Sequence, residues 1–145
     1  MKELKNLEDI FDNYDTFVID LWGVMHNGVV LNPKAIEAVD QLKKNLKKIV
    51  FLSNAPRPSS KVINFLVKME MDKKFLEHVI TSGEAAMHAI NQKKFGRTFF
   101  HLGPERDISV FEKVKDNRTD LHSCDFILCT GLFDDYDNDL DYYKK

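Results

Sequence analysis

Short apolar runs and apolar positions at helical spacing alternate along the chain. The run TFVID at residues 16–20 predicts a buried strand that ends on an aspartate. The segment after it has apolar residues at the spacing of an amphipathic helix: Ile36, Val39, Leu42 and Leu46. Pro33 suits the first turn of that helix, and Asn32 suits its N-cap. A second apolar run, KIVFLSN at residues 48–54, then predicts a second buried strand.

The same alternation continues along the rest of the chain. A further helix is predicted by Val62, Phe65, Leu66 and Met69, with Ser59 or Ser60 as its cap. Further strands are predicted at residues 78–82, 97–103 and 125–131. Helices are predicted between them at residues 84–94 and around Ile108, Phe111 and Val114. Strands that alternate with helices predict an α/β fold in which helices cover a parallel sheet.

Composition is that of an ordinary globular chain and argues against two classes of partner. The 145 residues are 43% hydrophobic and 30% charged, which fits about one folded domain. A net charge of −2 gives no electrostatic reason to bind nucleic acid or an anionic membrane surface. No apolar run approaches the roughly 20 residues of a membrane span, and charges spread through residues 1–15 argue against a signal peptide. We therefore expect a cytoplasmic protein.

Two features that could suggest metal binding have plainer interpretations. Cys124 and Cys129 are five positions apart in a predicted strand, so their side chains would point to opposite faces, and we expect two structural thiols. The acidic tail has the alternating spacing of a calcium loop at Asp135, Asp137 and Asp139. The sixth position of such a loop should be glycine, but it is Leu140 here. We expect the start of a solvated helix instead.

Polar residues follow two consecutive predicted strands, at the point where each strand ends. Asp20 ends the first strand, and Ser53 and Asn54 end the second. Ligands of open parallel sheets bind beyond the carboxyl ends of the strands, so we expect these side chains to meet. Taken singly, such an aspartate is an ordinary turn former, and a Ser-Asn pair is ordinary in loops. Together they suit phosphoryl transfer, in which a carboxylate attacks phosphorus while a hydroxyl and main-chain N–H groups hold the phosphoryl oxygens.

The chain resembles the haloacid dehalogenase-like hydrolase superfamily in these two motifs. VIDLWGV at residues 18–24 is similar to the first motif, a strand ending D-x-D-G-x, and VFLSNAPRPS at residues 50–59 is similar to the second. In one subclass of this superfamily an α/β cap domain is inserted after the second motif. Two segments of this chain resemble cap sequences of that subclass: VITSGEAAMHAI and CDFILCTGL. That subclass contains phosphatases of sugar phosphates, nucleotides and nitrophenyl phosphate. The resemblance implies a Rossmann-like core begun by residues 1–72 and an incomplete cap over residues 73–145.

The resemblance also implies a site and a reaction. Asp20 would be the nucleophile and a Mg²⁺ ligand, and the main-chain carbonyl of Trp22 would be a further metal ligand. Ser53 and the Asn54 amide would bind the phosphoryl group, while Arg57 would either contact substrate or be an ordinary surface residue. The implied reaction is hydrolysis of a small phosphorylated metabolite, a sugar phosphate or a nucleotide, through an aspartyl-phosphate.

One departure from the family pattern concerns proton transfer. Trp22 stands where the family has the aspartate that acts as general acid and base, and indole cannot do that work near neutral pH. Losing such a catalyst costs about 10²- to 10⁴-fold in rate. His26, on the same loop, could take over the proton transfer or could be a solvent-facing loop residue. The other histidines are interpreted as structural: His78, His88, His101 and His122.

A second departure concerns the groups that the family places after its cap. No apolar strand ending in paired aspartates follows Gly131, and the only later lysines are Lys144 and Lys145. The chain therefore resembles the first half of a longer phosphatase, and we expect little turnover from it alone. The alternative is a non-catalytic protein on the same scaffold that binds a phosphorylated ligand or a partner. A nucleotide-binding domain is disfavoured because G-x-G-x-x-G and G-x-x-x-x-G-K-S/T are both absent.

Overall fold

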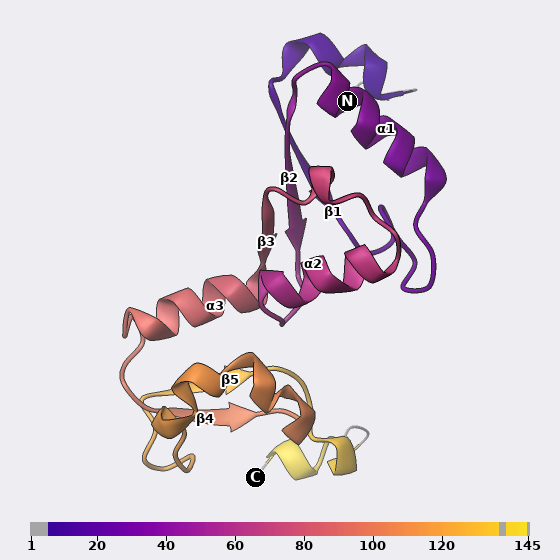
Figure 1. Cartoon of the computed structure of the whole chain (residues 1–145). Helices are drawn as coiled ribbons and strands as arrows, with labels where there is room; N and C mark the ends of the chain where they lie inside the picture. Colours follow the sequence, from indigo (N-terminus) through magenta and orange to yellow (C-terminus); the bar gives the residue numbers. More distant parts are fainter. Residues whose placement is uncertain (1–5, 137–138, 145) are drawn as a thin grey trace. The chain divides into compact units, whose positions relative to one another are not determined.

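The computed structural model describes residues 6–136 and 139–144, apart from the side chain of Ser109, and contains two compact units, Met1–Ser82 and Gly83–Lys145 (Figure 1). The first unit contains β1 (Thr16–Asp20), α1 (Pro33–Lys44), β2 (Lys48–Ser53), α2 (Ser59–Lys68), β3 (Val79–Thr81) and 3₁₀ helices at Leu7–Asp9, Phe11–Asn13 and Lys73–Phe75. Helix α3 (Ser82–Asn91) begins at the boundary, and β4 (Phe99–Leu102) and β5 (Phe126–Cys129) belong to the second unit. No helix in the described ranges is long and apolar enough to cross a membrane.

The strands of the first unit form a parallel sheet in the order β1-β2-β3. Asp20 at the end of β1 is opposite Leu52 of β2, and Ser53 at the end of β2 is opposite Thr81 of β3. The carboxyl ends of all three strands therefore lie at one edge of the sheet. This confirms the predicted α/β architecture and places the polar strand ends together.

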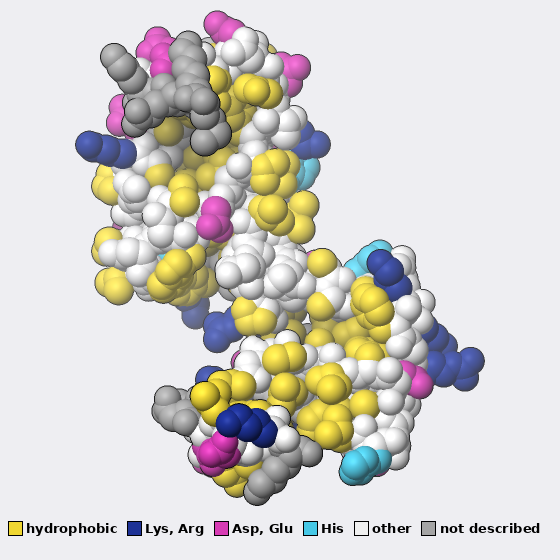
Figure 2. Space-filling view, turned by 180° about the vertical axis from the view of Figure 1, so that it is seen from behind, with side chains coloured by type: hydrophobic (Ala, Val, Ile, Leu, Met, Phe, Trp, Pro, Cys, Tyr) yellow, Lys and Arg dark blue, Asp and Glu magenta, His cyan; other side chains and the backbone are white. Residues whose placement is uncertain are grey.

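Helices α1 and α2 pack on the same face of this sheet. Side chains from that face and from both helices form one hydrophobic core, which includes Phe17, Val39, Leu42, Ile49, Phe51, Val62 and Leu66. Because successive strand residues point to opposite faces, the intervening apolar side chains lie on the other face. Three of these are exposed: Val18, Leu52 and Ile80. Figure 2 shows hydrophobic side chains at the surface of both units in the face that it presents.

Helix α1 starts where the sequence predicts, but it ends earlier. The side chain of Asn32 accepts a hydrogen bond of 3.2 Å from the main-chain N–H of Lys34, and a proline occupies the first helical position. The prediction that Leu46 belongs to the apolar stripe is wrong. The helix ends at Lys44, and Leu46 is 94% exposed with φ of +59°. Its N–H donates to Lys43 O at 3.0 Å, which closes the helix end instead of extending it.

The cap of α2 also differs from the prediction. Ser59 and Ser60 are the first two residues of the helix, and the N-cap is Pro58, which makes no side-chain cap hydrogen bond. Proline has an extended backbone here, with φ of −54° and ψ of 145°, and so directs the chain into the helix one residue earlier than a serine cap would.

The second unit contains a two-stranded parallel sheet formed by β4 and β5. Its core comprises Met87, Ile90, Phe99 and Phe111. The single helix predicted around Phe111 is replaced by two 3₁₀ helices, Glu105–Val110 and Glu112–Asn117. Phe111 lies between them, fully buried, with its ring 5.3 Å from that of Phe99. Packing of this side chain, rather than helical periodicity, explains the apolar spacing.

The two units divide after Ser82, whereas the family resemblance placed a boundary after residue 72. Strand β3 pairs with β2, and Phe75 and Leu76 are part of the core of the first unit. Residues 73–82 therefore belong to the first unit, to which they contribute β3 and part of the core. The assignment of the second unit to a cap remains a prediction.

The cysteines and the described part of the acidic tail lie in the second unit. Cys124 precedes β5 and Cys129 ends it, and both are free thiols. The tail forms short 3₁₀ helices at Asp134–Tyr136 and Tyr142–Lys144, while Asp137 and Lys145 lie outside the described residues.

Candidate active site

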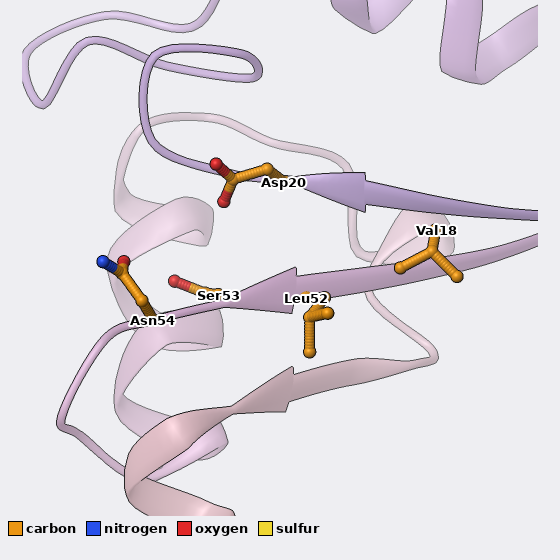
Figure 3. Close-up of a pocket in the computed structure, with 5 residues that line it drawn as sticks. All are labelled: Val18, Asp20, Leu52, Ser53 and Asn54. Atoms are coloured by element: carbon orange, nitrogen blue, oxygen red, sulfur yellow. The ribbon is translucent and has the colours of Figure 1, made fainter.

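Asp20, Ser53 and Asn54 meet at the carboxyl edge of the first sheet (Figure 3). Together with Val18 and Leu52 they line an open cavity of about 540 Å³. The three residues therefore lie together as the sequence predicts, because β1 and β2 are neighbouring parallel strands that end at the same edge. Figure 3 shows the Asp20 carboxylate and the Ser53 hydroxyl extending beyond the ends of their strands.

Local hydrogen bonds orient both of these groups. Asp20 Oδ1 accepts a hydrogen bond of 2.7 Å from the N–H of Leu21. Ser53 is buried, and its Oγ accepts a hydrogen bond of 3.2 Å from the N–H of Ala55. A hydroxyl has one proton and two lone pairs, so in this bond Ser53 keeps its own proton for donation to an anion.

The loop after β2 is held in place by the end of β3, which sequence reasoning missed. The hydroxyl of Thr81 donates to Arg57 O at 2.7 Å, and that of Ser82 donates to the carbonyl oxygens of Asn54 and Ala55 at 2.8 and 2.9 Å. A polar pair at the end of a strand was the signal that identified Ser53 and Asn54, and the same signal is present at Thr81. The side chain of Arg57 is exposed and is not among the residues that line the cavity.

The loop after β1 is a compact turn built on the buried side chains of Leu21 and Met25. The carbonyl of Leu21 accepts hydrogen bonds from the N–H groups of Met25 and His26, at 2.8 and 3.2 Å. Gly23 N–H donates to His26 O at 2.8 Å, with Gly23 in the left-handed region at φ of +77°. The backbone that follows Asp20 is therefore fixed by its own hydrogen bonds, including the peptide that carries the Trp22 carbonyl.

His26 is buried, so the expectation of a solvent-facing histidine is wrong. It is only 6% exposed, because its ring packs edge-on against the rings of Trp22 and Phe65, with centroids 5.4 and 5.5 Å apart. Its Nδ1 accepts a hydrogen bond of 3.0 Å from the N–H of Gly28, which assigns the proton of the neutral ring to Nε2. Burial lowers the pKa of His26, and the nearby Asp20 carboxylate opposes this shift. A proton-transfer role for His26 remains a prediction.

The oxygen donors at this edge suit a hard cation but do not enclose one. Mg²⁺ is held in proteins by one or two carboxylates, retains several waters and shares the phosphate oxygens of its substrate. The Asp20 carboxylate and the Trp22 carbonyl, on one short segment, fit that pattern in part. Among the residues that the structure describes, no three His, Cys, Asp or Glu side chains cluster so as to hold a metal ion.

Solved structures with the same fold are about twice as long as this chain. A haloacid dehalogenase-like hydrolase from Brucella suis is 28% identical, with a TM-score of 0.80 over 97% of this chain and 53% of that one. A 4-nitrophenylphosphatase from Thermotoga maritima is 27% identical, with a TM-score of 0.63 over 83% and 46%. A glycerol phosphate phosphatase from Mycobacterium tuberculosis, crystallised with magnesium, is 23% identical, with a TM-score of 0.53 over 75% and 32%. The last likeness shows the fold alone.

Sequence comparison gives the family. No curated protein matches the chain significantly. The sequence model of the haloacid dehalogenase-like hydrolases matches residues 17–115, which is more than half of the chain and includes both strand ends of the cavity. The chain belongs to the haloacid dehalogenase-like hydrolase family.

Proposed function

We propose that the chain carries the nucleophile and phosphate-binding groups of a Mg²⁺-dependent phosphatase. The observation that carries the proposal is the Asp20 carboxylate and the Ser53 hydroxyl at adjacent strand ends over one cavity. Membership of the hydrolase family supports it, as does the likeness to a 4-nitrophenylphosphatase. The substrate proposed is a small phosphorylated metabolite, a sugar phosphate or a nucleotide, in the cytoplasm.

The proposed reaction has two displacements at phosphorus. Asp20 attacks the phosphoryl group, the ester oxygen leaves, and water then hydrolyses the aspartyl-phosphate to restore the carboxylate and release phosphate. Ser53 and the Asn54 amide hold phosphoryl oxygens by donating hydrogen bonds. Mg²⁺, held by Asp20 and the Trp22 carbonyl, would neutralise charge on the phosphoryl oxygens.

The leaving oxygen needs a proton, which the Trp22 side chain cannot supply. Burial lowers the pKa of His26 and so favours its neutral form, and a neutral imidazole is a very weak proton donor. We therefore propose that esters with acidic leaving groups, such as phenols, react faster than alkyl esters, since a phenolate, whose conjugate acid has a pKa of about 10, leaves without protonation far more readily than an alkoxide.

Trapping with a phosphoryl analogue tests the proposal without requiring turnover. Calorimetric titration of the chain with beryllium fluoride and Mg²⁺ should give saturable binding, which Asp20→Asn should abolish because the analogue bonds to the carboxylate. Asp15→Asn is the matched control, since Asp15 is fully exposed and precedes the amino end of β1. Absence of binding to the unmodified chain, or equal binding by Asp20→Asn, would contradict the proposal.

A second candidate is a non-catalytic protein that binds a phosphorylated ligand on the same groups. Trp22 in the place of the acid favours it, because binding needs no proton transfer. The two candidates separate on turnover of phenyl phosphate: release of phenol that Asp20→Asn abolishes supports the phosphatase. Saturable binding of phenyl phosphate without release of phenol supports the binding protein. This measurement uses protein that also contains any continuation of the chain.

A further inference from the structure

Strand β1 is an edge strand, and its outer side is open. The sheet order is β1-β2-β3, so β1 pairs with β2 on one side only. The N–H of Lys48, opposite Thr16, donates to Asp15 O at 2.8 Å, so the main-chain groups of Asp15 and of every second residue after it point toward β2. Those of Thr16 and Val18 point away from β2, and within the described residues neither has another main-chain partner. The open side of β1 thus presents the groups to which a further strand can bond.

A cavity of about 510 Å³ follows this open side. Four consecutive residues of β1, 17–20, line it. Because successive side chains of a strand point to opposite faces, a cavity lined by four residues in succession runs along the edge of the strand. Its other wall is apolar and includes four residues of α1: Ala35, Ala38, Val39 and Leu42. Helix α1 therefore covers space in which a further strand would lie.

The sequence of β1 fits this space when it pairs with a copy of itself. In antiparallel pairing centred on Val18, each Val18 lies opposite the same residue of the other copy. Polar Thr16 then lies opposite Asp20 of the second copy, and apolar Phe17 lies opposite Ile19. Such matched pairs stabilise antiparallel strands, whereas a register centred on Asp20 would set two like charges opposite each other.

The alternation of side chains in β1 also matches the two sides of the space. Phe17 belongs to the core on which α1 packs, and Ile19 packs against that core. Side chains directly opposite each other in an antiparallel pair lie on the same face of the sheet. Phe17 and Ile19 of a second copy would therefore face the apolar wall that α1 provides. Val18 of that copy would lie on the other face, next to the Val18 that is 63% exposed here.

We propose that β1 is a dimerisation surface, on which a second copy of this chain adds its own β1 in antiparallel orientation about a two-fold axis at Val18. Pairing of the same strand from both copies is isologous and leaves neither copy with an open β1 edge. The surface does not depend on the proposed reaction, although the pairing sets the Thr16 hydroxyl of the second copy opposite Asp20.

Analytical ultracentrifugation tests the association. The chain should form dimers in a concentration-dependent way, and Val18→Lys should raise the dimer dissociation constant about ten-fold or more, because it sets two ammonium groups opposite each other at the axis. Val29→Lys is the matched control, at an 80% exposed position in the loop after β1, and it should leave the constant unchanged. A chain that is monomeric at all concentrations, or equal effects of the two substitutions, would overturn the proposal.

Disulfide cross-linking tests the geometry. In the proposed register the two Val18 Cα atoms lie about 5.5 Å apart, within the range of roughly 4.4–6.8 Å that a disulfide spans. With Cys124→Ser and Cys129→Ser removing the thiols of the chain itself, Val18→Cys should give a covalent dimer with oxidised glutathione, and Val29→Cys should not.

Two further arms identify other occupants of the edge. Ile80→Cys, at an exposed position of β3, should not cross-link, because β3 lies at the opposite edge of the sheet. Cross-linking of Ile80→Cys as readily as Val18→Cys would show that the sheet faces meet instead, and would overturn the proposal. Loss of the Val18→Cys cross-link in protein that also contains any continuation of the chain would overturn it too, because the chain would then fill its own edge.

Discussion

The hydroxyl of Thr81 donates a hydrogen bond of 2.7 Å to the main-chain oxygen of Arg57, 24 residues earlier in the chain. Thr81 is fully buried at the end of β3, and Arg57 lies in the loop after β2. The loop that follows Ser53 is thus fixed by the next strand, β3. This loop carries the groups proposed to hold phosphate, so its stability and its binding should change together.

Replacing Thr81 with valine should destabilise this loop. The substitution keeps the shape of the side chain but removes the donor to Arg57 O, at a cost of roughly 1 kcal/mol in the free energy of unfolding. Urea unfolding measures this cost. Thr81→Ser, which keeps the hydroxyl, is the control, and it should lose less phosphate affinity than Thr81→Val. Equal phosphate affinity in the two variants would contradict the proposed link between strand end and loop.

Ser53→Ala should weaken binding of inorganic phosphate about ten-fold or more. Hydrogen bonds to charged groups contribute about 1.5–3 kcal/mol, and Ser53 is the buried hydroxyl beside Asp20 in the cavity. Calorimetric titration with phosphate and Mg²⁺ measures the change. Ser53→Thr should bind better than Ser53→Ala because it keeps a donor, whereas an unchanged affinity in Ser53→Ala would remove this residue from the proposed site.

The second unit should lose stability in mild acid because of His101. This side chain is fully buried, with Nε2 2.9 Å from Thr130 Oγ1 and no partner at Nδ1 among the described residues. Burial lowers the pKa of His101, and the Arg118 charge acts in the same direction. The unfolded chain then binds the proton more readily than the folded one. The free energy of unfolding should therefore have its full value above about pH 6.5, the ordinary pKa of histidine. It should fall as the pH decreases from there through the lowered pKa of His101.

Thermal unfolding at a series of pH values tests this expectation. His101→Gln should remove part of the acid sensitivity, and His122→Gln, at an exposed position, should leave it as it is. The same acid sensitivity in His101→Gln as in the unmodified chain would show that other groups cause it.

The uncovered sheet face should promote self-association of the chain. Val18, Leu52 and Ile80 expose apolar surface on one face, and unpaired strand edges and apolar patches favour association. Ile80→Lys should lower the sedimentation coefficient at high concentration, and Leu46→Lys, at an exposed leucine beyond the end of α1, should not. A chain that stays monomeric at all concentrations, with one sharp unfolding transition, would contradict this prediction.

Local patterns were enough to predict the strands and the meeting of Asp20 with Ser53. Apolar runs gave the strands, and the rule that parallel strands end together then placed these two residues at one edge without any knowledge of the contacts. The start of α1 was predictable for the same reason, because a cap such as Asn32 acts on its nearest neighbours.

Features that depend on distant packing were not predictable. His26 is polar and lies in a loop, and its burial requires Phe65, which is supplied by a helix much later in the chain. Phe111 has helical spacing but lies between two 3₁₀ helices, because contact with Phe99 determines its place. Propensity and periodicity describe near neighbours, whereas burial is decided by the whole fold.

The hydrogen bond between Leu21 N–H and Asp20 Oδ1 makes the two oxygens of this carboxylate unequal. One oxygen is engaged by a main-chain donor, which draws negative charge toward it, while Oδ2 retains the freer lone pairs. In the proposed reaction Oδ2 would then become the atom that joins carbon to phosphorus. If Asp20 is the nucleophile as proposed, the backbone would select the bridging atom of the acyl-phosphate before any substrate binds.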